Sequence, residues 1–131
     1  MRIKDHMEAF EEHRSTIFKW GLNTYGLSKS QRIVGLHASR GIVELLSAYL
    51  HKEKLIDEGF QINHRWFKSE KISEKLPDFK NKGKIIKKMV ELELLSEQLS
   101  YGSPKPTKTI EKALILFKDI ENEISRSMKN G

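Results

Sequence analysis

Apolar residues recur at three- and four-residue steps along nearly the whole chain, and this helical period restricts the fold more than any other feature. Strand signals are almost missing, because apolar and polar residues nowhere alternate convincingly between Asn-Gly or Asp-Gly turns. The 131 residues suffice for one domain that buries its own core. We therefore expect a single all-α domain over residues 1–131, an up-and-down bundle of about five helices with a four-helix core.

The longest predicted helix begins at Ser28 or Ser30, whose hydroxyl can cap it, and extends to about Lys54. It carries two apolar stripes: Val34, Ala38, Gly41, Leu45 and Ala48, and Ile33, Leu36, Val43 and Leu50. A helix that is apolar on two sides needs neighbours on both, so it should be the central helix of the bundle. Gly35 and Gly41 inside it cost about 1 kcal/mol each relative to alanine, which favours close approach of another helix or of a second subunit.

Turn and capping residues divide the rest of the chain into four further helices. We expect helices over residues 3–20, 64–76, 84–101 and from 107 or 109 to 124. The helix over 3–20 should end near Gly21, and the helix over 64–76 at Pro77. Connections are expected at 22–27, at 55–62 around Gly59, and at 103–106, where two prolines prevent a continuous helix. Residues 1–2 and 126–131 are expected to fray.

Composition excludes several classes of function. The chain has no cysteine, which rules out disulfides, thiol nucleophiles and zinc or iron–sulfur sites built from cysteine. Its five histidines show no metal-ligand spacing, so neither a metal nor another cofactor is expected. No apolar run approaches the roughly 20 residues of a membrane span, and no export signal is recognisable, so we expect a cytoplasmic protein without a membrane partner. The abundance of lysine and glutamate is typical of hyperthermophile proteins, and also of AT-rich genomes.

Arg32 and His37 are the first candidates for chemistry. Histidine can move a proton while arginine holds a phosphate, so a pair like this could serve RNA cleavage without a metal. Five residues apart, the two lie about 140° apart around a helix, so they could meet a ligand only at the edge between two faces. The alternative is a half-buried His37 with a structural hydrogen bond beside a surface arginine.

Two further groups are candidates for ligand binding: Arg40 and Glu44 on the central helix, and His64, Arg65 and Trp66 at a helix start. Arg40 lies among apolar positions, so it needs an acidic partner, such as Glu44, or a bound anion. The backbone N–H groups that follow Asn63 could take an anion, with Arg65 adding charge and Trp66 a stacking surface. The alternative is structural, with an ion pair at Arg40, Asn63 as a helix cap and Trp66 in the core.

The excess positive charge is concentrated in one stretch. The stretch from His64 to Lys88 contains nine bases and three acids. Its net charge of +6 equals that of the whole chain. Besides Arg65, these bases are Lys68, Lys71, Lys75, Lys80, Lys82, Lys84, Lys87 and Lys88. Such a face could attract RNA or DNA through counterion release, although a lysine-rich surface can also arise from composition alone.

The segment from His37 to Leu50, followed by a loop and Asn63-His64-Arg65-Trp66, resembles the HEPN superfamily of helical domains. Their central helix often combines small residues, a glutamate and an apolar run, and a histidine opens the next helix after a loop. The stretch from Leu94 to Gly102 resembles their penultimate helix, so the resemblance covers the chain from about Ser30 onward. It implies a bundle of four or five helices that is often a homodimer.

HEPN proteins include RNases of toxin–antitoxin systems and non-catalytic members that partner nucleotidyltransferases. Their catalytic signature is an arginine followed four to six residues later by a histidine, usually in a late helix. Arg32 and His37 have this spacing but lie in the early central helix, and no histidine follows Glu97-Gln98 and Tyr101. The resemblance therefore implies a non-catalytic relative that binds a protein, a nucleotide or a nucleic acid. The alternatives are an RNase that uses Arg32 and His37 and a nucleic-acid-binding module that uses the 65–88 face.

Overall fold

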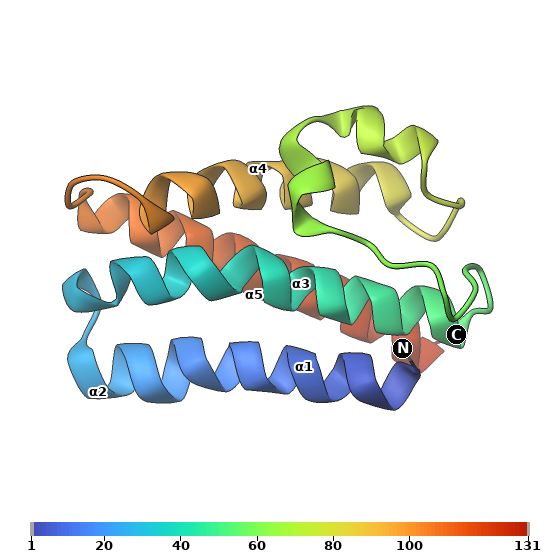
Figure 1. Cartoon of the computed structure of the whole chain (residues 1–131), viewed down its shortest axis with the longest axis horizontal. Helices are drawn as coiled ribbons and strands as arrows, with labels where there is room; N and C mark the ends of the chain where they lie inside the picture. The colour runs from blue at the N-terminus through green and yellow to red at the C-terminus, as the bar shows by residue number, and fades with distance from the viewer. Residues whose placement is uncertain (1, 131) are drawn as a thin grey trace.

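Four long antiparallel helical rods form the domain in a computed structural model that describes residues 2–130 (Figure 1). The first rod comprises α1 (Ile3–Ser15), η1 (Thr16–Leu22) and α2 (Asn23–Tyr25), and the second comprises η2 (Ser28–Ser30) and α3 (Gln31–Lys52). The last two rods are α4 (Lys82–Ser100) and α5 (Thr107–Asn130). They run alternately up and down, and the described residues contain no strand, so the predicted all-α up-and-down bundle is confirmed.

Helix α3 is the centre of the bundle and packs against α1, α4 and α5 (Figure 1). Fourteen of its residues are buried, which confirms the helix predicted to need neighbours on two sides. Leu36 departs from the predicted stripe, since 42% of it is exposed. Both interior glycines serve close contacts within the chain: a Cβ on Gly35 would meet the backbone of α4, and one on Gly41 would lie 3.0 Å from His13 Cβ.

The first rod is longer than the sequence predicted. It passes through Gly21 as a π-helical turn and ends at Gly26, whose φ of 81° is left-handed. Gly21 is buried, and a Cβ there would lie 3.1 Å from Ile33 Cγ2. The prediction that Gly21 ends the helix was wrong because this glycine serves packing, whereas Gly26 supplies the positive φ at which the rod ends, a backbone angle that residues with a side chain rarely adopt.

Residues 53–81 arch over α3 and α4 without forming the single helix predicted for 64–76 (Figure 1). Two short 3-10 helices occupy this stretch, η3 (His64–Lys68) and η4 (Glu70–Glu74), and extended Ser69 separates them. The predicted cap at Asn63 is present, since its Oδ1 accepts a hydrogen bond from the backbone N of Arg65 at 2.8 Å. Each short helix is anchored by one buried apolar residue, Phe67 or Ile72.

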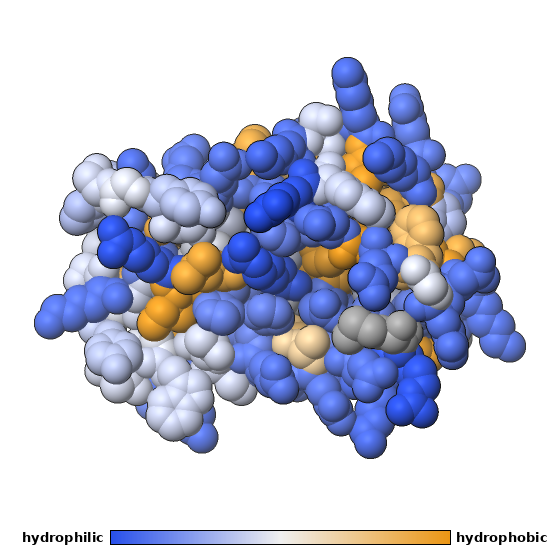
Figure 2. Space-filling model, viewed as in Figure 1, coloured by the Kyte–Doolittle hydropathy of each residue, from blue (hydrophilic) through white to orange (hydrophobic). Residues whose placement is uncertain are grey.

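Helix α1 begins at Ile3, directly after extended Arg2, and α5 reaches the other end of the described residues. The sequence analysis expected residues 1–2 and 126–131 to fray, but α5 continues to Asn130 with Ser127 buried; Met1 and Gly131 lie outside the described residues. No helix within residues 2–130 combines the length and apolar character that a membrane span requires. The face shown in Figure 2 is predominantly hydrophilic, with apolar side chains showing in small groups.

Candidate functional site

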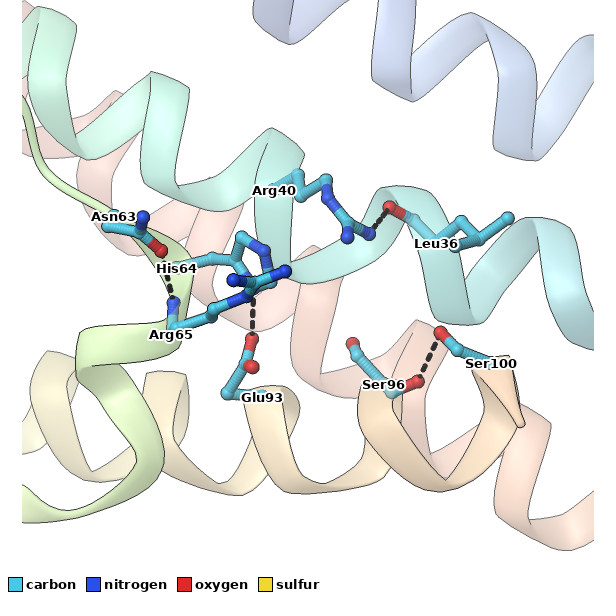
Figure 3. Close-up of polar contacts among 8 residues, drawn as sticks. All are labelled: Leu36, Arg40, Asn63, His64, Arg65, Glu93, Ser96 and Ser100. Atoms are coloured by element: carbon cyan, nitrogen blue, oxygen red, sulfur yellow. Dashed lines mark hydrogen bonds and ion pairs between the residues drawn. The ribbon is translucent and has the colours of Figure 1, made fainter. Parts of the chain in front are cut away.

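A cleft of about 230 Å³ lies between α3, η3 and the C-terminal half of α4. Four residues that the sequence analysis singled out line it together, namely Arg40, His64, Arg65 and Lys68. Figure 3 shows the side chains of Arg40, His64 and Arg65 converging from α3 and η3 on the space above α4. The other lining residues are Gly35, Ser39, Glu93, Ser96, Glu97, Ser100 and Tyr101.

The geometry of η3 aims its side chains at the cleft. In a 3-10 helix, residues three positions apart lie above one another, so His64 shares a side with Phe67, and Arg65 with Lys68. Phe67 is buried in the core, which turns His64 inward toward α4. Arg65 and Lys68 are exposed and form the rim of the cleft.

Glu93 of α4 holds His64 in place. The imidazole Nδ1 donates a hydrogen bond to Glu93 Oε1 at 2.9 Å, and only 4% of Glu93 is exposed (Figure 3). A buried carboxylate is costly without a partner, so this contact fixes both side chains. Because Nδ1 is bound to the carboxylate, Nε2 is the ring nitrogen left for a ligand.

Three cations at the cleft have no carboxylate partner. Among residues 2–130, no Asp or Glu lies within ion-pair distance of Arg40, Arg65 or Lys68. Arg40 donates to the carbonyl oxygen of Leu36 one turn earlier, so the acidic partner predicted for it is not found in this part of the chain. Three cations against the carboxylates of Glu93 and Glu97 leave the lining with a formal charge of +1 when His64 is counted as neutral.

Two hydroxyl groups in the lining lack hydrogen-bond partners. Ser39 on α3 is 4% exposed and Ser96 on α4 is 3% exposed, yet neither Oγ atom has a partner among the described residues. In Figure 3 the Ser96 hydroxyl points into the space between Glu93 and Arg40. Most buried polar groups in folded proteins are hydrogen-bonded, so two unpartnered donors beside three unpaired cations favour a site for a bound anion.

Glu44 and Trp66, the other two predicted ligand-binding residues, lie outside the cleft lining. Glu44 Oε2 accepts a hydrogen bond from His6 Nδ1 at 2.7 Å, which joins α1 to α3. Trp66 packs edge-on against Phe60, with the Lys75 ammonium 5.4 Å from its ring centre. Both residues have structural partners, as the alternative interpretation held for Trp66.

Arg32 and His37 have separate neighbours. Arg32 Nη2 donates to the carbonyl oxygen of Gly102 at 3.4 Å, whereas His37 Nδ1 lies 2.9 Å from His13 Nδ1 on α1. One of the two imidazoles must donate an N–H to the other, so both cannot carry a proton on these nitrogens at once. Burial is the main cause that lowers the pKa of both histidines, and Arg40 lowers the two pKa values further.

The basic stretch 65–88 is less positive in the fold than its composition suggests. Lys84 pairs with Glu123 of α5 at 2.7 Å, and this contact lowers the pKa of that carboxyl. Lys88 lies 3.9 Å from Asp119, also on α5. Lys82 is nearly enclosed and donates to the carbonyl oxygens of Ser73 and Leu76, so it fastens the arch to α4. Lys68, at the cleft rim, stands apart from these paired lysines.

Comparisons with family models, with curated proteins and with solved structures found no match.

Ser39, Glu93 and Ser96 are buried lining residues that the sequence analysis missed. Glu93 is four residues after Met89, and Ser96 three residues before Leu99, so both lie within the apolar stripe of α4. A carboxylate and a hydroxyl at positions that otherwise face a core are the signal that could have revealed them.

Proposed function

We propose that this domain is a non-catalytic binding protein that takes the phosphate group of a nucleotide or nucleic acid in the cleft between α3, η3 and α4. The observation that carries the proposal is Arg40: a half-buried guanidinium on the central helix that faces the cleft and has no carboxylate among the described residues. A half-buried guanidinium without a carboxylate partner favours a bound anion in its place. Arginine donates to phosphate in a fixed planar arrangement, and Arg65 approaches the same space from η3.

Fluorescence anisotropy with a 3′-labelled single-stranded RNA tests this proposal. Arg40→Gln and Arg65→Gln should each weaken binding about tenfold or more, since a hydrogen bond to a charged group contributes about 1.5–3 kcal/mol. Arg126→Gln is the matched control, because it removes the same charge from a position of α5 outside the cleft lining. Equal losses in all three variants would show that binding depends on overall charge and would refute the cleft.

The salt dependence separates the cleft from the alternative 65–88 face. Besides the phosphate in the cleft, Arg65 and Lys68 at the rim can neutralise neighbouring phosphates of a single strand, so the three cations predict a slope of log K against log salt no steeper than about −2. Engagement of all eight lysines of the 65–88 stretch would give a slope of about −6. The paired Lys84 and Lys88 favour the smaller value.

RNA cleavage by Arg32 and His37 is the other alternative. Their separate hydrogen bonds, to Gly102 and to His13, give no support to a joint catalytic role. Incubation of labelled RNA with the wild type and with His37→Ala tests the point: we expect the RNA to stay intact with both, and cleavage that His37→Ala abolishes would overturn the non-catalytic proposal.

The resemblance to the HEPN superfamily stays a prediction, as do the homodimer and the nucleotidyltransferase partner that it implies. The glycines that suggested a second subunit are both covered by helices of the same chain. A dimer, if it forms, has to use another surface.

A further inference from the structure

We propose that the cleft prefers a phosphate monoester over an internal phosphodiester, so that its ligand is a nucleoside monophosphate or the 5′-phosphorylated end of a strand. This inference rests on the proposed function, because it names the class of ligand for the same cleft. Three features carry it: the closed floor, the number of donors at the floor, and the position of the cations at the rim.

The cleft is closed on its inner side. Gly35 brings α3 against α4 so tightly that an added Cβ would lie 2.6 Å from the backbone N of Ser100. The lining residues are graded in depth: Ser39, Glu93 and Ser96 are buried, whereas Arg65, Lys68, Glu97 and Tyr101 are exposed. A ligand therefore enters past the exposed rim and reaches the buried floor with one end.

A monoester matches a closed floor better than a diester does. An internal phosphodiester carries the chain on both sides, so both ester groups would have to leave a cleft of about 230 Å³ through its rim. A terminal phosphate carries one substituent and can face the floor with its three free oxygens. That end then contacts Ser39, Ser96 and Arg40, while Arg65 and the exposed Tyr101 ring meet the nucleoside or the next nucleotide.

The donors at the floor also favour the monoester. The two unpartnered hydroxyl oxygens are almost fully covered by neighbouring atoms, so they become available to a ligand once their side chains rotate. Together with the Arg40 guanidinium they can then supply hydrogen bonds to all three free oxygens of a monoester, whereas a diester offers only two. A monoester carries about −1.5 to −2 charges at pH 7, close to twice that of a diester. The carboxylate of Glu93 repels this charge, but one of its oxygens already accepts the hydrogen bond from His64 Nδ1, and the three cations of the lining outnumber the two carboxylates.

The test uses two otherwise identical 3′-fluorescein single-stranded RNAs, one with a 5′-phosphate and one with a 5′-hydroxyl. Anisotropy titration of the full chain at pH 7.5 should give at least a tenfold lower Kd for the phosphorylated strand, about the worth of one hydrogen bond to a charged group. Unlabelled AMP identifies the source of the monoester. Displacement of the strand at similar concentration indicates a free nucleotide, and failure to displace it indicates a strand end; either result supports the monoester.

The double variant Ser39→Ala/Ser96→Ala links the preference to the floor. Neither hydroxyl has a hydrogen-bond partner among residues 2–130, so the variant should retain wild-type stability, which thermal unfolding checks. We expect the ratio of the Kd for the 5′-hydroxyl strand to the Kd for the phosphorylated strand to fall most of the way to one in this variant. Equal affinity of the wild type for both RNAs would overturn the monoester and leave the proposed function standing. Absence of binding to both RNAs and to AMP would overturn both.

Discussion

Replacement of Gly35 by alanine tests the contact between α3 and α4 that determines the packing at the cleft. The added Cβ would lie 2.6 Å from the backbone N of Ser100, 2.7 Å from the carbonyl carbon of Leu99 and 2.8 Å from Ser100 Oγ. Ordinary van der Waals contact begins at 3.4 Å. Since two of the three atoms belong to the helical backbone, α4 has to move away from α3 by several tenths of an ångström.

Two opposing effects determine the size of the change. Overpacking of a close contact costs about 1–3 kcal/mol, and a clash with backbone belongs to the upper half of that range. Alanine in place of glycine inside a helix returns about 1 kcal/mol. The free energy of unfolding should therefore fall by about 1–2 kcal/mol, which corresponds to a decrease in Tm of about 3–10 °C for a domain of this size.

Chemical denaturation followed by far-ultraviolet circular dichroism measures this change, and Gly83→Ala is the matched control. Gly83 lies in the first turn of α4, and a Cβ added there would meet no heavy atom within 4 Å outside its own helix turn and chain neighbours. The control should therefore be neutral or up to about 1 kcal/mol more stable. If Gly35→Ala proves as stable as Gly83→Ala, the close approach of α3 and α4 is wrong.

Three further predictions concern the buried histidine pair, the lysine that joins the arch to α4, and the oligomeric state. Burial lowers the pKa of His13 and His37, so below about pH 6.5 the unfolded chain binds protons that the folded chain does not; the free energy of unfolding should be nearly constant from pH 8 to 7 and fall from pH 6.5 to 5. A flat profile in urea titrations across that window would contradict the buried pair. Lys82→Met should lower stability by about 1–3 kcal/mol because two carbonyl oxygens lose their donor, whereas Lys80→Met at an exposed position should change it by under about 0.5 kcal/mol; equal effects would refute the structural role of Lys82. Light scattering at high micromolar concentration tests the homodimer, and a strict monomer would exclude it at that concentration.

Helix periodicity predicted most of the fold because the long rods are amphipathic over many turns. The helix predicted for 84–101 became α4 with its stripe of Ile85, Met89, Leu92 and Leu99 buried. The arch was harder to predict, since a stretch as short as 64–76 takes its conformation from where it docks. Phe67 and Ile72 each anchor one turn, and a continuous α-helix is replaced by two 3-10 turns.

Glycines were ambiguous in sequence for a physical reason. A glycine permits both a left-handed backbone and a close contact, and the chain uses Gly26 for the first and Gly21 for the second. Only the fold decides between the two uses, because the second depends on a neighbour from another helix. For Gly35, whose place inside a long apolar pattern excluded a helix end, the sequence analysis correctly expected a close contact.

The candidate site was predictable on one side only. Arg40 stood out because a charge among apolar positions requires a partner, and His64 and Arg65 because they follow a capping residue. Their counterpart Glu93 is 29 residues from His64, and no local pattern encodes a contact of that separation. Yet both sides obey one rule: a polar side chain on a face that packs inward needs a partner. In the sequence of the four rods this rule selects both Arg40 and Glu93. Gly35 belongs to the same site, because it is the point at which α3 and α4 approach each other beside the cleft. Gly35 permits close contact between α3 and the C-terminal end of α4. Nearer the middle of α4, His64 of η3 lies between the helices and donates a hydrogen bond to Glu93.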